Sequence, residues 1–272
     1  MDFFEDYDYL AVLREKDKLK EKYPYVSVET IGKSVMGREI FALSVGQAEE
    51  NALFIGGFYG AQRFSTQMLV IFFNELCKGI AENGSIEGMR VRRALSGRAL
   101  TVIPCINPDG CEISSKGRSA QMPGLPFLER KNSCGFKNFR LNARGIDINL
   151  NFCGKSAFSE PESLYVKEFL KKTPVRHAVF FGSGKNEIVS PFGEKVPERS
   201  RRMAEIMVAA TGYDNINSKE NSEREGFLNW FCETFDRPAF KVLPEFCETD
   251  GKEKILKVYK ELRELMMLSA IM

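Results

Sequence analysis

Residues 142–152 read Asn142-Ala143-Arg144-Gly145-Ile146-Asp147-Ile148-Asn149-Leu150-Asn151-Phe152. They follow directly after a segment, residues 111–142, that is rich in Gly, Ser, Lys and Arg. We expect this segment to be irregular, together with the strongly polar residues 213–225. Loops of such length are unusual in a compact domain and often form the lid or rim of a functional site. A surface insertion without a role is the alternative.

Outward from this stretch, short runs with strand composition alternate with helical patterns. The candidate strands are Val26–Ile31, Ile40–Val45, Ala52–Gly56, Leu100–Cys105, Ala178–Phe181 and Ala239–Leu243. The candidate helices are Gln67–Ile80, Pro161–Lys172, Glu198–Ala210, Gly226–Phe235 and Lys252–Leu268. The alternation predicts an α/β fold with a mostly parallel sheet and helices on both faces. No internal repeat or linker is visible, so we expect residues 1–272 to form one domain.

Composition excludes several functional classes. Of the 272 residues, 43% are hydrophobic and 28% charged, which is the balance of a globular protein. The net charge is +2 with acids and bases mixed, so no nucleic-acid-binding face is expected. The N-terminal residues are acidic and no apolar run is long enough for a bilayer, so we expect neither a signal sequence nor a membrane span. Seven scattered cysteines then suggest reduced thiols and a cytoplasmic location.

The predicted sheet also indicates where a ligand would bind. In open α/β sheets, ligands bind at the carboxyl ends of the strands. The residues that follow Gly56, Cys105, Phe181 and Leu243 should therefore converge on one cleft.

Five segments, in order, carry a family resemblance. Besides residues 142–152, they are Ile31–Ile40, Asn107–Gly110, Ser159–Ser163, and Gly226–Phe231 with Arg237–Phe240. Together they resemble the zinc carboxypeptidases of the carboxypeptidase A type, and most closely the bacterial branch that cleaves γ-D-glutamyl and murein peptides. The resemblance implies a zinc-carboxypeptidase-like fold: a mixed, mainly parallel, twisted sheet of about eight strands between helices.

The family's zinc ligands are missing from the aligned positions. The resemblance implies an H-x-x-E motif after a strand and a second histidine after a later strand, which leave an open position for water. Here the three positions hold Tyr59, Gln62 and Gly182, so we expect no zinc cofactor. The single histidine, His177, lies five residues before Gly182, about 16 Å away along a strand and on the opposite face. We expect it to be structural.

The remaining catalytic positions also depart from the family. Leu243 aligns with the general base, unless a two-residue shift brings Glu245 there past a proline. The Asn-Arg pair that grips the substrate's terminal carboxylate corresponds to Asn149-Leu150, so its bidentate arginine is absent. The mobile tyrosine aligns with Asn221.

Two polar residues match positions that surround the active site in the family. Arg140 matches the arginine that polarises the scissile carbonyl, and Asp147 matches the carboxylate that orients the first zinc histidine. With no histidine there, we expect Tyr59 or Arg63 to satisfy Asp147, and Tyr59 and Gln62 to lie side by side at the metal position. The small Gly182 should leave room for a pocket.

The leading interpretation is a non-catalytic protein whose cleft binds a peptide or a small carboxylate-bearing ligand. The expected ligand-binding residues are Tyr59, Gln62, Arg140, Asn149, Gly182 and Ser183. No residue is assigned a catalytic role, although Arg140, Asn149, Asp147 and Glu245 are cleft candidates. One alternative is a metallocarboxypeptidase acting on peptides or murein peptides with atypical ligands, to which Cys105 and Cys153 contribute little evidence. Another is a metal-free enzyme that uses Ser65, Ser183, Lys185, Glu187 or Cys105.

Overall fold

The computed structural model describes residues 7–120, 124–131, 135–190, 198–217, 226–246 and 250–272. An eight-stranded mixed sheet forms its centre, in the order β1-β2-β6-β3-β7-β10-β8-β9. Its strands are β1 (Ser27–Lys33), β2 (Glu39–Gly46), β3 (Asn51–Gly56), β6 (Ala99–Ile103), β7 (Val175–Phe181), β8 (Glu187–Ser190), β9 (Asp214–Asn217) and β10 (Ala239–Leu243). The four central strands, β6, β3, β7 and β10, are parallel to one another. The predicted mixed sheet of about eight strands is confirmed.

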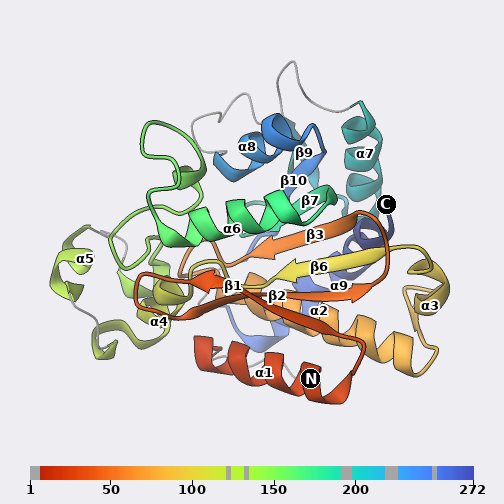
Figure 1. Ribbon diagram of the computed structural model, residues 1–272, viewed down its shortest axis with the longest axis horizontal. Coiled ribbons are helices and arrows are strands. Elements are labelled where there is room, and N and C mark those ends of the chain that lie inside the picture. The colour runs from red at the N-terminus through yellow and green to blue at the C-terminus, as the bar shows by residue number, and fades with distance from the viewer. Residues whose placement is uncertain (1–6, 121–123, 132–134, 191–197, 218–225, 247–249) are drawn as a thin grey trace.

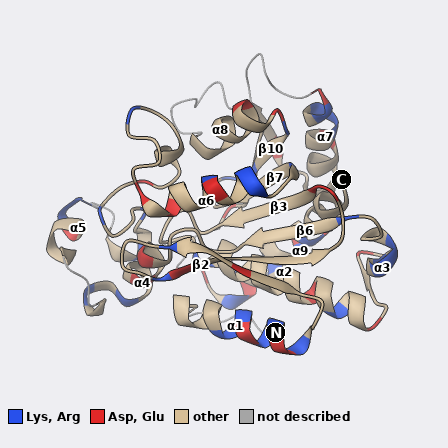
Figure 2. Ribbon diagram, in the orientation of Figure 1, with Lys and Arg blue, Asp and Glu red and all other residues tan. Residues whose placement is uncertain are grey.

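Helices cover both faces of this sheet (Figure 1). One face packs against α1 (Tyr9–Lys22), α2 (Arg63–Ala81), α7 (Arg199–Thr211) and α9 (Lys252–Ile271). The other packs against α6 (Pro161–Lys172) and α8 (Gly226–Phe235). After α2, the chain forms a two-stranded ribbon of β4 (Ser85–Ile86) and β5 (Met89–Arg90), followed by a short helix α3 (Val91–Ala94). Charges of both signs are interspersed along α1 and α6 (Figure 2), and none of the helices in the described ranges has the length and apolar character needed to cross a bilayer.

The segment 111–142 is more regular than predicted. It contains the end of α4 (Pro108–Lys116) and all of α5 (Leu125–Lys131). These helices surround a small apolar cluster of their own, formed by Ile113, Ala120, Leu128 and Phe139. The prediction of an irregular segment is therefore wrong here. For residues 213–225 it is wrong over β9, and residues 218–225 lie outside the described ranges.

The carboxyl ends of the central strands meet at one edge of the sheet, as predicted. After β3 and β6, the N–H of Asn107 donates to the carbonyl of Gly57 at 2.9 Å. After β7 and β10, the N–H of Gly182 donates to the carbonyl of Val242 at 3.0 Å. Gly57 has a positive φ of 62°, and a Cβ there would lie 2.9 Å from the Cα of Cys105. Only glycine fits this turn.

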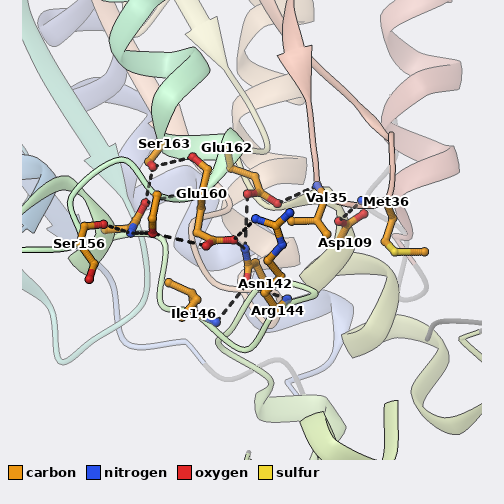
Figure 3. Close-up of polar contacts among 12 residues, drawn as sticks. Val35, Met36, Asp109, Asn142, Arg144, Ile146, Ser156, Glu160, Glu162 and Ser163 are labelled. Atoms are coloured by element: carbon orange, nitrogen blue, oxygen red, sulfur yellow. Dashed lines mark hydrogen bonds and ion pairs between the residues drawn. The ribbon is translucent and has the colours of Figure 1, made fainter. Parts of the chain in front are cut away.

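Polar side chains from the family segments hold the loops at this edge together (Figure 3). Asp109, fully buried at the start of α4, accepts hydrogen bonds from Ser34 Oγ at 2.8 Å and from the N–H of Met36 at 2.9 Å. The guanidinium of Arg38 donates to the same carboxylate at 2.7 Å. The turn before β2 is thereby fixed to the loop that follows β6.

Asn142 joins residues 142–152 to the start of α6. Its Oδ1 accepts from the backbone N–H groups of Arg144 and Ile146, and its Nδ2 donates to Glu160 at 2.8 Å and to Glu162 at 3.4 Å (Figure 3). Glu162 also accepts from the N–H of Val35 at 3.3 Å. These segments therefore specify how the loops are held, which is a structural role.

Replacing Glu162 with glutamine is expected to flatten the dependence of stability on pH. Burial, aided by the charge of Asp109, raises the pKa of Glu162 from 4.5 to about 7. The folded chain therefore binds this proton more tightly than the unfolded chain. The free energy of unfolding should fall as pH rises from 4.5 through 7, by up to about 3 kcal/mol from this group. Urea unfolding of both proteins across that window measures the difference, and equal slopes would contradict it.

Candidate functional site

Positions 62, 182 and 243 meet at the carboxyl edge of the sheet. Gln62 immediately precedes α2, Gly182 follows β7, and Leu243 ends β10. A Cβ placed on Gly182 would lie 2.9 Å from Nε2 of Gln62 and 3.0 Å from Cδ2 of Leu243. The expectation that Gly182 leaves room is therefore wrong, because the amide of Gln62 and the side chain of Leu243 occupy the space beside it.

Tyr59 and Arg140 lie together at this site. The guanidinium carbon of Arg140 is 4.0 Å from the centre of the Tyr59 ring, a close cation–π contact. The carbonyl of Tyr59 accepts the N–H of Gln62 at 2.9 Å, so both residues belong to one turn. Arg140 is exposed, so its charge is open to solvent beside the ring of Tyr59.

Asp147 lies close enough to Arg140 for the two charges to interact. Its Oδ1 accepts from the backbone N–H of Asn149 at 3.0 Å and of Leu150 at 3.3 Å. Burial raises the pKa of Asp147, while those hydrogen bonds and the positive charges of Arg140 and Lys241 oppose the rise. The expected contact of Asp147 with Tyr59 or Arg63 stays a prediction.

Asn149 and Leu150 have different environments. Asn149 is fully buried, and its Oδ1 accepts from the N–H of Phe227 at the start of α8, at 3.3 Å. A Cβ on Gly226 would overlap the carbonyl of Asn149, so glycine is required for this contact. Leu150 is 38% exposed and presents an apolar side chain where the family has its arginine. The binding role of Asn149 stays a prediction, and its observed contacts are structural.

Glu245 does not take the position of the general base. β10 ends at Leu243, which pairs with Glu187 of β8. Glu245 lies beyond the strand and is exposed, and its N–H donates to Oδ1 of Asn186 at 2.7 Å. Leu243 is the residue that faces Gly182, so the two-residue shift is wrong. Asn221 lies outside the described residues.

His177 is structural, as predicted. It is fully buried in β7, and its Nε2 lies 2.8 Å from the carbonyl of Ser269 in α9. Burial and, to a lesser extent, the charge of Arg176 lower the pKa of His177 to about 3, so the ring is neutral at ordinary pH.

The side chains considered for metal-free chemistry do not form a reactive pair. Ser65 is buried and donates to the carbonyl of Gln62 at 2.8 Å, at the start of α2. Ser183 and Lys185 are both exposed, and no hydrogen bond joins them within the described ranges. Cys105 is buried, whereas Cys153 is exposed with its Sγ 3.2 Å from the carbonyl of Leu150.

The donors at the three aligned positions do not fit zinc. A catalytic zinc requires three protein ligands that are histidines, carboxylates or thiolates. Here they are a phenol, a neutral amide and a glycine, at Tyr59, Gln62 and Gly182. In the part of the chain that the structure describes, no group of three or more His, Cys, Asp or Glu side chains could hold a metal ion.

The side-chain oxygen of Gln62 accepts no hydrogen bond. Its side chain is buried, with 6% of the residue exposed, and Oε1 has no hydrogen-bond partner. A buried carbonyl oxygen in this state costs about 1–3 kcal/mol. A bound molecule or water that offers an N–H or O–H group at this point would remove that cost.

Sequence reasoning missed Lys241. It lies in the middle of β10, is only 5% exposed, and has its Nζ 5.5 Å from the centre of the Phe180 ring. Its strand parity with Leu243 could have identified it, because residues two apart on a strand share a face.

Comparisons with known proteins identify the family and the fold. The family described as zinc carboxypeptidase matches residues 12–231. Two similar proteins are gamma-D-glutamyl-L-diamino acid endopeptidase 1 of Lysinibacillus sphaericus, 22% identical over 88% of this chain, and the uncharacterized protein YqgT of Bacillus subtilis, 24% identical over 87%. The chain spans 65% and 69% of the length of those relatives.

Solved structures share the fold. Thrombin-activatable fibrinolysis inhibitor superposes with a TM-score of 0.72 at 18% identity, covering 94% of this chain and 70% of that one. Murein-tripeptide amidase MpaA of Escherichia coli O157 gives 0.53 at 18% identity, covering 88% of this chain and 92% of its own.

Proposed function

The chain belongs to the zinc carboxypeptidase family, and from this premise we propose that it is a non-catalytic member whose cleft binds a peptide or a small carboxylate-bearing ligand. One observation carries the proposal. The side chains of Gln62 and Leu243 both lie against Gly182, and these three residues align with two zinc ligands and the general base of the family. A neutral amide, a hydrogen atom and an isobutyl group supply no metal ligand and no base at neutral pH.

The loss of hydrolysis follows from the chemistry of the reaction. In this family, zinc polarises the carbonyl and lowers the pKa of its bound water to about 7, and a carboxylate accepts the proton. A cleft without these groups lacks the largest electrostatic contributions to the rate.

Binding without hydrolysis is supported by what the cleft retains. Arg140 offers planar, permanently charged donors that suit a carboxylate, and the ring of Tyr59 holds its guanidinium in place. Gln62 Oε1 offers a buried acceptor for a ligand N–H. A peptide with a free terminal carboxylate carries both complementary groups.

The test combines metal content with turnover. After dialysis, the purified chain is expected to hold far less than one zinc per molecule. We also expect it to leave carboxypeptidase substrates and γ-D-glutamyl-diamino-acid peptides uncleaved when zinc is added. Elemental analysis and mass spectrometry after long incubation measure the two quantities. Stoichiometric zinc together with cleavage, both lost in Gln62→Ala, would falsify the proposal.

A further inference from the structure

We propose that a pocket at the opposite edge of the sheet from the aligned positions binds a small carboxylate with an apolar body, and that Arg92 holds the carboxylate group. The pocket has a volume of about 560 Å³ and opens to solvent. This volume lies within the range of about 300–1,000 Å³ that is typical of small-molecule sites. The proposal is independent of the proposed function, because it uses none of the aligned positions.

The pocket lies where β2 ends. This strand runs antiparallel to β6, and Gly46 at the end of β2 pairs with Ala99 at the start of β6. The pocket is therefore at the amino edge of the parallel strands, whereas Gln62 and Gly182 lie at the carboxyl edge. Its other walls come from the turn before β1, the end of α2, and α3 with the residues that follow it (Figure 1).

Apolar side chains form much of the pocket wall, namely those of Val45, Ile80 and Leu95 and the ring of Tyr25. Val45 and Leu95 are buried, whereas Tyr25 is 42% exposed. The hydroxyl of Tyr25 donates to the carbonyl of Cys77 in α2 at 2.6 Å, which fixes the ring against that helix. An apolar molecule can therefore cover the ring without leaving its hydroxyl unpaired.

Of the described residues that line the pocket, Arg92 alone carries a charge. Its Nε donates to the carbonyl of Ile80 at 2.5 Å, and its Nη2 donates to that of Ala81 at 3.5 Å. One edge of the planar guanidinium group is thereby fixed to the last turn of α2. The edge formed by Nη1 and the second N–H of Nη2 has no acceptor within the described ranges. Two parallel N–H groups on this edge suit a carboxylate, and a side chain already held in place loses little freedom on binding.

The chain around the pocket is basic. Residues 88–98 contain four arginines and no acid, and Figure 2 shows this charge on α3. None of these arginines forms an ion pair with a residue that the structure describes. Glu49 is exposed and is not among the described residues that line the pocket. Three other acids close in sequence are paired with cations elsewhere, in the pairs Lys78–Glu82, Arg263–Glu87 and Arg237–Glu50. The local charge therefore favours an anion.

Capping α2 is the simpler role for Arg92, because a cation near a helix C-terminus stabilises the helix. The two roles respond differently to lysine. Lysine retains the positive charge at the end of α2 but cannot present two parallel N–H groups to a carboxylate. Arg92→Lys is therefore expected to keep the thermal stability of the wild-type protein and to lose most of its preference for a carboxylate.

The experiment compares octanoate with the neutral octanamide by calorimetric titration. Wild-type protein is expected to bind octanoate about tenfold more tightly than octanamide, and Arg92→Met should remove this preference. Arg93→Met is the matched control: it removes an exposed charge from the same helix, but Arg93 is not among the described residues that line the pocket. This variant should keep the preference.

A second variant locates the ligand without changing Arg92. Gln47 is exposed and lines the pocket, so Gln47→Glu adds a carboxylate there at little cost to the fold. We expect this variant to weaken octanoate about tenfold and to leave octanamide unchanged. It decides the matter if Arg92→Met does not fold.

Several outcomes would overturn the proposal. They are no binding of octanoate by wild-type protein at millimolar concentration, equal affinities for acid and amide, and an unchanged affinity for octanoate in Gln47→Glu. Equal losses in Arg92→Met and Arg93→Met would show a general effect of charge and would also contradict it. Arg140→Met separates this pocket from the cleft of the proposed function. If that variant alone loses octanoate, the ligand binds in the cleft and the pocket proposal is wrong.

Discussion

Replacing Asp109 with alanine is expected to lower the free energy of unfolding by about 3–5 kcal/mol. Asp109 is fully buried and accepts from Ser34 Oγ, the N–H of Met36 and the guanidinium of Arg38. Truncation leaves three donors without an acceptor, and one of them is a charged group with limited access to water. Urea denaturation followed by circular dichroism measures the loss.

A matched control isolates the effect of burial. The ion pairs Arg38–Asp109 and Arg118–Glu129 have the same N–O distance, 2.7 Å. The side chains of the second pair are 80% and 38% exposed, so Glu129→Ala is expected to cost less than about 1 kcal/mol. Equal losses in the two variants would show that the network around Asp109 does not stabilise the fold.

The elements whose bounds were predicted best are those whose start and end are marked by residues in the local sequence. Helix α6 begins at Pro161, where the ring fixes φ for a first helical turn, and α8 and β10 also have their predicted bounds. β8 and β9 were missed because each has four residues and exists through pairing with a neighbour. Helix α1 was missed although Asp8 caps it by accepting the N–H of Ala11 at 2.9 Å. Its stripe of buried apolar residues is narrow and interrupted by charges.

The sequence identified which residues occupy the aligned positions of the site, but it predicted their arrangement in space only in part. Sequence placed Tyr59, Gln62 and Gly182 together because strand ends converge, and the structure brings Gln62 against Gly182. How the space beside Gly182 is filled depends on the side chains of Gln62 and Leu243, which no local pattern determines.

The aligned positions themselves can be tested by restoring the family's ligands. The triple variant Tyr59→His, Gln62→Glu, Gly182→His is expected to retain about one zinc per chain after dialysis. The backbone permits the change, because Gly182 is not among the glycines with positive φ. The two close contacts of a Cβ there are with the mobile ends of side chains, one of which, that of Gln62, is itself replaced.

Zinc should then stabilise the triple variant and leave wild-type protein unaffected. At a free zinc concentration one hundred times the Kd, the expected gain is about 2.7 kcal/mol, which thermal unfolding with and without zinc detects. The double variant that keeps Gly182 has only two ligands and should show little gain. We expect no peptidase activity from the triple variant, because Leu243 still cannot accept a proton. A folded triple variant that does not bind zinc would show that these three positions are not the family's metal site, and the argument for a lost metal would fail with it.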